Sequence, residues 1–197
     1  MKMKYLSCAE TAKLVRKALK EAFPGVPFRV KSHVYSGGAS IDVKWCGGPL
    51  TRKVEAVAKA YQGGGFDGMI DLAYSRTHYL RADGTTLVAH DPGTTGSGGQ
   101  HEPEDNRALE PVLPADAERV HFGANFIFCT RETPAGWRDE AEAYVRAHCV
   151  LTPGHTPAAD RFGNEWIGDF VRRLVHHHLE GEGWDVTMAE HRNRAIW

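Results

Sequence analysis

The stretch FRVKSHVYSGGASIDVKW, residues 28–45, decides the fold that this sequence predicts. Apolar and polar side chains alternate along residues 28–35 and again along residues 40–45. A period of two is typical of strands in a half-buried antiparallel sheet. The residues between the two runs, 36–39, include two glycines, which supply positive φ in tight turns. The stretch therefore predicts a β-hairpin with one apolar face and one charged face.

The charged face of this hairpin carries Arg29, Lys31 and His33 on the first strand, and Lys44 beside Asp42 on the second. Basic side chains on a flat face can neutralise phosphates, which gives sequence-independent binding that weakens with salt. Strands with charged outer sides are also common in proteins that bind no nucleic acid, and Asp42 can balance Lys44. The pattern leaves a nucleic-acid surface and a solvated face as alternatives.

A helix is predicted on the N-terminal side of the hairpin, over about residues 8–23. Ser7 and Glu10 form a capping-box pattern at its start, and Pro24-Gly25 ends it. Four basic residues fall away from its apolar stripe: Lys13, Arg16, Lys17 and Lys20. We expect them to form a basic outer face, which could join the charged face of the hairpin in one continuous positive surface.

The remaining elements are read from the same two periodicities. A second helix is predicted over about residues 50–61, ended by the glycine run 63–65, with strands at 69–74, 85–90 and 120–129. Residues 91–118 are rich in glycine and then in acids, which indicates a long loop or insertion. Helices are expected at about 136–149 and 164–180.

Together these elements predict an α+β fold. An N-terminal helix and a second helix pack on a mainly antiparallel sheet, followed by a helical C-terminal extension. The expected domains are residues 1–131, interrupted by the insertion 91–118, and residues 132–197.

Charge is divided unevenly along the chain. Residues 1–60 contain twelve Lys and Arg against four acids, a balance of +8, whereas residues 61–197 contain twelve against twenty-one, a balance of −9. Such a split indicates either a polyanion-binding face or two regions that neutralise each other. The acidic part of the insertion, residues 101–118, is the candidate for self-neutralisation.

Candidate metal ligands gather between residues 67 and 91. Asp67, Asp71 and His78, with His90 and Asp91 further on, are types that bind Mg²⁺, Mn²⁺ or Zn²⁺. Their spacing matches no ligand signature, and Asp67-Gly68 is equally good turn chemistry. The tract His176-His177-His178 is predicted to be structural, because three neighbours on a helix cannot converge on one ion.

The four cysteines are far apart and form no C-x-x-C pair, which favours free thiols in a cytoplasmic protein. No apolar run approaches the roughly 20 residues that a membrane span needs. The first residues lack the apolar core of a secretory signal. We therefore expect a protein of the host-cell cytoplasm that does not enter a membrane.

Four blocks in order, YLSCAETAKLVRKALKEAFPG, FRVKSHVYSGGASIDVKW, FDGMIDL and VHFGANFIFCTRE, resemble large polyvalent protein associated domain 29 over about residues 5–131. The resemblance implies a setting in phages or conjugative plasmids. There, polyvalent proteins are thought to accompany incoming DNA and counter host defences such as restriction. It implies no established activity and no catalytic residues.

The preferred function is therefore a non-catalytic binding protein acting in counter-defence, with nucleic acid or a host defence protein as its partner. Its contact surface would be the eight residues Lys13, Arg16, Lys17, Lys20, Arg29, Lys31, His33 and Lys44. The alternative is a metal-dependent enzyme of nucleotides or nucleic acid that uses Asp67, Asp71 and His78. A divalent metal is the one cofactor that this pattern leaves open, and no oligomeric state is indicated.

Overall fold

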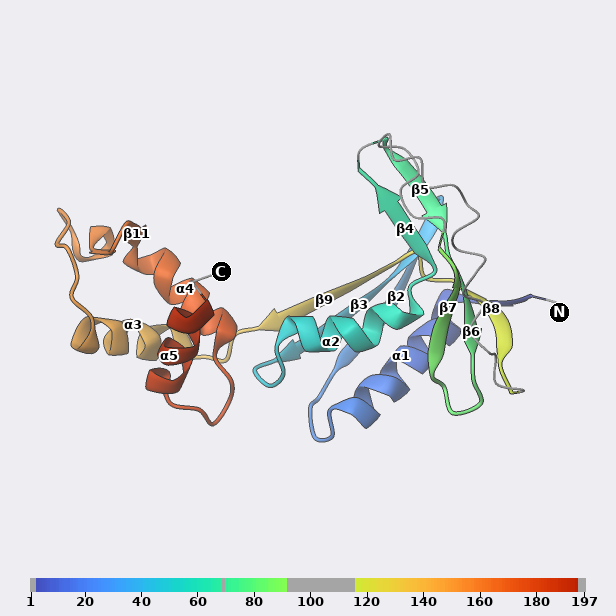
Figure 1. The fold of residues 1–197 in the computed structure, drawn as a ribbon, viewed down its shortest axis with the longest axis horizontal. Coiled ribbons are helices and arrows are strands. Elements are labelled where there is room, and N and C mark those ends of the chain that lie inside the picture. Colours follow the sequence, from blue (N-terminus) through green and yellow to red (C-terminus); the bar gives the residue numbers. More distant parts are fainter. Residues whose placement is uncertain (1–2, 69, 92–115, 195–197) are drawn as a thin grey trace. The chain divides into compact units, whose positions relative to one another are not determined.

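The structure, a computed structural model, describes residues 3–68, 70–91 and 116–194 (Figure 1). Within them the chain has the predicted α+β fold, with helices and mixed or antiparallel sheets. It divides into two compact units. The first comprises Met1–Lys44 and Thr51–Thr130, and the second comprises Trp45–Leu50 and Arg131–Trp197. The sequence placed the boundary between residues 131 and 132, and no pattern indicated that residues 45–50 belong with the C-terminal part.

Helix α1, Cys8–Ala22, follows the short strand β1, Lys4–Leu6, and confirms the predicted N-terminal helix. The capping box is present: the Glu10 amide donates to Ser7 Oγ at 3.2 Å, and the Ser7 amide donates to the Glu10 carboxylate at 2.8 Å. These bonds satisfy two amides that a helix start leaves without partners. Val15 and Leu19 are fully buried on the side of α1 that faces the sheet.

The predicted hairpin forms strands β2, Arg29–Tyr35, and β3, Gly38–Cys46. Strand β3 is the middle strand of a sheet in the order β2-β3-β9, in which β9 is Phe126–Glu132. Tyr35 pairs with Gly38, so the connection is the two residues 36 and 37 rather than the four expected. Gly37 has φ +90°, a conformation that favours glycine.

The predicted second helix is confirmed as α2, Thr51–Ala58, extended by the 3₁₀ turn η1, Lys59–Tyr61. The next prediction is wrong in part, because the strands are β4, Gly64–Asp67, and β5, Leu72–Ser75, instead of one strand at 69–74. The helical segment ends at Tyr61, before the glycine run as predicted, and Gly64 and Gly65 of that run belong to β4. A Cβ on Gly64 would lie 2.8 Å from the Asn125 carbonyl oxygen, and one on Gly65 would lie 2.2 Å from the Tyr74 ring.

A four-stranded sheet in the order β1-β8-β6-β7 completes the first unit, with β6 at Thr77–Leu80, β7 at Thr86–His90 and β8 at Glu118–Phe122. Strand β8 pairs parallel to β1 and antiparallel to β6. The strand predicted at 120–129 is two strands, β8 and β9, Phe126–Glu132. Of the predicted insertion, residues 92–115 lie outside the described part of the chain.

The second unit confirms both predicted C-terminal helices, as α3, Trp137–His148, and α4, Ile167–His177. Four further elements were not predicted: η2, Pro157–Ala159; β10, Arg161–Phe162; β11, Glu165–Trp166; and α5, Trp184–Arg194. The core between the helices is built from Ala141, Val145, Ile167, Phe170, Val171, Leu174, Val175 and Met188. Among the described residues, no helix is long and apolar enough to cross a membrane.

Arg131 and the histidine tract make hydrogen bonds and ring contacts within this unit. The Arg131 guanidinium donates to four backbone carbonyls, those of Gly47, Gly48, His176 and His178, at 2.6–3.1 Å. His178 is buried, and its ring stacks on that of Trp184 with 3.8 Å between centroids. The structural role predicted for the tract is therefore confirmed at His178.

Candidate nucleic-acid interface

The pairing of β2 with β3 sets which side chains share a face. Arg29 lies opposite Lys44 and Lys31 lies opposite Asp42, so all four point to the same side of the sheet. The alternate residues of the two strands point to the other side, where Ile41 and Val43 are fully buried. The hairpin thus has the predicted apolar face and charged face.

The charged face lies on the side of the sheet away from the helices. Helix α1 contacts β2 and α2 and covers the apolar face (Figure 1). On the opposite side there is a groove of about 210 Å³, which is lined by Arg29, Lys31, His33, Asp42 and Lys44. We call this side of β2, β3 and β9 the outer sheet face.

The cations of the outer sheet face differ in their partners. His33 Nε2 lies 3.2 Å from the Asp42 carboxylate, with both side chains partly exposed. Arg29, Lys31 and Lys44 form no side-chain ion pair or hydrogen bond with any other residue that the structure describes. The face therefore combines three unneutralised cations with one carboxylate that is already paired.

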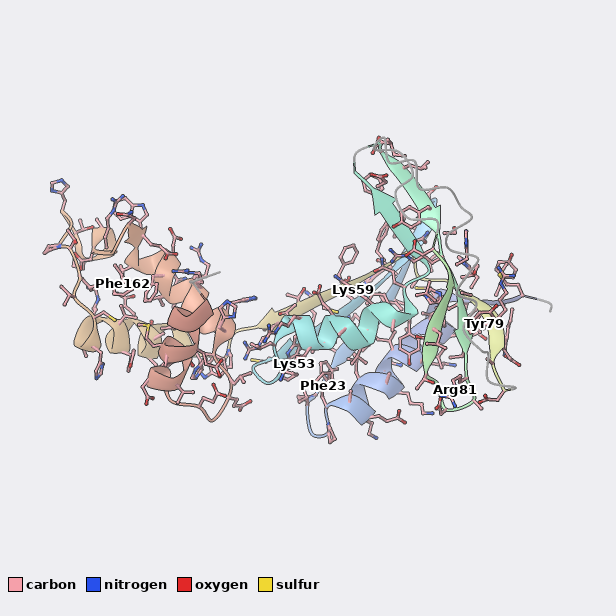
Figure 2. All side chains as sticks on the ribbon, viewed as in Figure 1. Phe23, Lys53, Lys59, Tyr79, Arg81 and Phe162 are labelled. Carbon is pink, nitrogen blue, oxygen red and sulfur yellow. The ribbon has the colours of Figure 1, made fainter. Side chains whose placement is uncertain are left out.

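The four basic residues of α1 lie elsewhere, which corrects the expectation of one continuous positive surface. Lys13, Lys17 and Lys20 project from the side of the helix opposite the buried Val15 and Leu19, and Arg16 lies beside strand β2. Lys53 lies on α2 and Lys59 on the following turn η1, also on the helix side (Figure 2). Basic residues are thus present on both sides of the sheet in two separate sets.

Two members of the helix set have partners. Arg16 donates to the Val30 carbonyl of β2 at 3.0 Å. Lys17 lies 3.9 Å from the Glu21 carboxylate and 3.5 Å from the Asp83 carbonyl oxygen. Arg16 therefore satisfies a strand carbonyl, which is a structural role, and Lys13 and Lys20 remain as exposed cations.

The outer sheet face also carries aromatic side chains that the sequence did not single out. Tyr35, on the same side of β2 as Lys31, is 50% exposed, and Phe128 of β9 is 55% exposed. The Phe126 and Phe128 rings stack with 6.3 Å between centroids. A Cβ on Gly38 would lie 3.0 Å from the Tyr35 ring and 3.1 Å from Asn125 Oδ1, so this ring covers Gly38 and reaches the start of β9.

The alternation of β9 assigns its two phenylalanines to the outer side. Ile127 is buried with the core, so Phe126 and Phe128 point the other way. Cys129 agrees with this assignment. Burial, with the Glu55 carboxylate as the second cause, raises the pKa of this thiol to about 11, which places it beside α2.

The candidate metal ligands lie on three different elements. Asp67 ends β4 and is buried, Asp71 lies in the turn after it with φ 54°, and His78 is buried in β6. Burial, followed by the Arg76 guanidinium, lowers the pKa of His78 to about 4. Within residues 3–68, 70–91 and 116–194, no three or more His, Cys, Asp or Glu side chains form a group able to hold a metal ion. Metal binding stays a prediction, which elemental analysis would test.

Comparison with known proteins gives one match. The family model of large polyvalent protein associated domain 29 matches residues 6–134, which include both helices of the first unit and all of its strands after β1. Neither the curated proteins nor the solved structures gave a match. Because the match covers well over half of the chain, the protein belongs to the family of large polyvalent protein associated domain 29, which implies a polyvalent protein associated with phages or plasmids.

Proposed function

We propose that the protein is a non-catalytic nucleic-acid-binding protein whose outer sheet face contacts phosphates through Arg29, Lys31 and Lys44. The observation that carries this proposal is that the three cations are neighbours on one face and have no partner among the described residues. Cations left without partners beside each other raise the local potential, and a polyanion lowers it. In a protein associated with phages or plasmids, such a surface fits a role in counter-defence.

The number of cations sets the expected salt dependence. Each neutralised phosphate contributes a slope of about −0.7 to the logarithm of affinity against the logarithm of salt for a single strand, and about −0.9 for a duplex. Three contacts therefore predict a slope of about −2 to −3.

Fluorescence anisotropy with a short labelled oligonucleotide, titrated at several salt concentrations, measures this slope. Binding that is insensitive to salt, or no binding at low salt, would contradict the proposal. A host defence protein is the competing partner for the same face. If a host protein stays bound after nuclease treatment and oligonucleotides do not bind, a host protein is the partner of this face and nucleic acid is not.

A further inference from the structure

We infer that the outer sheet face binds single-stranded nucleic acid, with unpaired bases stacked on Phe126, Phe128 and Tyr35 while Arg29, Lys31 and Lys44 hold the phosphates. This inference rests on the proposed function, because it specifies the kind of nucleic acid that the same face accepts.

The cations and the exposed aromatic side chains share one face of the sheet. The cations lie on β2 and β3, and the phenylalanines lie on β9, on the other side of β3. Neighbouring strands are about 4.8 Å apart, so Arg29 and Lys31 on β2 lie roughly 10 Å from the β9 row and Lys44 on β3 lies roughly 5 Å from it. That spacing lets a strand place its phosphates over one row and its bases over the other.

The Tyr35 and Phe128 side chains of this face are exposed to solvent. Phe128 is more than half exposed, and its ring stacks on that of Phe126, so it presents a flat apolar surface to solvent. Ser40, the β3 residue paired with His33, is small and adds no bulk between the rows.

The exposed rings favour single strands over duplexes. In a duplex the bases are stacked on one another and show only their edges, so a ring on a flat sheet cannot reach a base face. An unpaired base offers its face to any aromatic ring, which makes such binding tolerant of sequence. A duplex would meet only the three cations, whereas a single strand would meet the cations and the rings.

Charge decides against a protein as the occupant of the rings. A protein partner would have to bring carboxylates to three cations and an apolar side chain to the phenylalanines. A single strand carries a phosphate and a base in every nucleotide, so it supplies both groups at a regular spacing.

The test compares labelled oligo-dT, oligo-U and a DNA hairpin duplex by anisotropy with three proteins: wild type, F128L and F126L/F128L. The matched control is F66L, because Phe66 is also about half exposed in the first unit but lies on β4. We expect the wild type to bind single strands more tightly than the duplex. F128L should lose roughly ten-fold in single-strand affinity and the double variant more, whereas F66L should be unchanged. The DNA and RNA arms distinguish the two sources of single strands.

The salt dependence of the affinity distinguishes base stacking on the aromatic rings from phosphate contact by the cations. Replacing phenylalanine removes stacking and leaves the phosphate contacts, so the slope of F128L should equal that of the wild type. Equal affinity for single strands and duplex, with no loss in F126L/F128L, would overturn this inference and leave the proposed function standing. Failure of every oligonucleotide to bind, with or without a host protein retained after nuclease treatment, would overturn both.

A second readout covers the case in which F126L/F128L unfolds. An oligonucleotide containing 5-iodouracil, irradiated in complex with the wild type, cross-links to aromatic side chains that stack on the base. We expect the attachment at Phe126, Phe128 or Tyr35 when the peptides are read by mass spectrometry. Attachment only outside the outer sheet face would overturn the inference without any variant.

Discussion

The two units of this protein use their cations in opposite ways. In the second unit, Arg131 is half-buried, donates to four backbone carbonyls and lies against the Trp137 ring. Burial lowers its pKa from the ordinary arginine value. In the first unit, Arg29, Lys31 and Lys44 share a face and have no partner among the described residues.

Structural cations can therefore be separated from binding cations by their partners, where the sequence shows only a basic region. A guanidinium that donates to several backbone carbonyls is part of the fold, and its loss leaves those acceptors without that partner. A cation with no partner contributes little to stability and is available to an outside anion.

The largest expected effect is on the stability of the second unit. Arg131→Lys removes the planar fork that reaches four carbonyls, and a single ammonium cannot replace it. We expect the unfolding free energy to fall by about 2–4 kcal/mol. All five tryptophans belong to this unit, so tryptophan fluorescence during denaturant unfolding reports it directly.

The matched control for that experiment is R138K. Arg138 is exposed on α3 and has no side-chain hydrogen bond or ion pair within the described residues. The unfolding midpoint of R138K should therefore equal that of the wild type. Equal unfolding midpoints for R131K and R138K would show that the Arg131 guanidinium does not stabilise the second unit.

A buried histidine of the first unit should behave as a structural group as well. The fold holds the pKa of His78 at about 4, below the ordinary value of about 6.5. Between these two values the unfolded chain binds a proton that the folded chain does not. The unfolding free energy therefore falls as pH drops from about 6.5 towards 4, by at most about 3 kcal/mol.

Unfolding followed by circular dichroism at about pH 7 and about pH 4.5 measures this term. H78L lacks the titrating ring, so its stability should change less over the same interval. If H78L and the wild type lose the same free energy on acidification, His78 does not carry the pH dependence.

A smaller effect is expected from the acidic stretch that follows β7 in the chain. Glu102, Glu104, Asp105 and Glu110 are opposite in sign to the cations of the outer sheet face. The variant E102Q/E104Q/D105N/E110Q keeps the length and removes four charges. We expect roughly a five-fold gain in oligonucleotide affinity at low salt, because tethered carboxylates compete with phosphates. An unchanged affinity would show that this stretch does not restrain the face.

Much of the fold was predictable because its signals are local. The alternation along residues 28–45 identified both strands of the hairpin and the side that carries Arg29 and Lys31. The Ser7 and Glu10 pair located the start of α1. Each of these signals depends only on residues a few positions apart.

The parts that sequence could not supply depend on distant contacts. Phe128 and Ile127 are both apolar, so alternation could not tell which of them faces solvent. Gly64 and Gly65 resemble chain breakers, but they form a strand because Asn125 and Tyr74 approach them closely. The helix and sheet cations looked like one surface because the sequence does not show which side of the sheet α1 covers.

We predict that the cations of the outer sheet face, rather than those of the helix, bind nucleic acid. The direct measurement is the salt dependence of oligo-dT affinity for R29Q/K31Q/K44Q and for K13Q/K17Q/K20Q, which remove three positive charges each. We predict that the sheet variant loses most of the wild-type slope of about −2 and the helix variant keeps it. Equal slopes for the two variants, or a greater loss in the helix variant, would contradict the account.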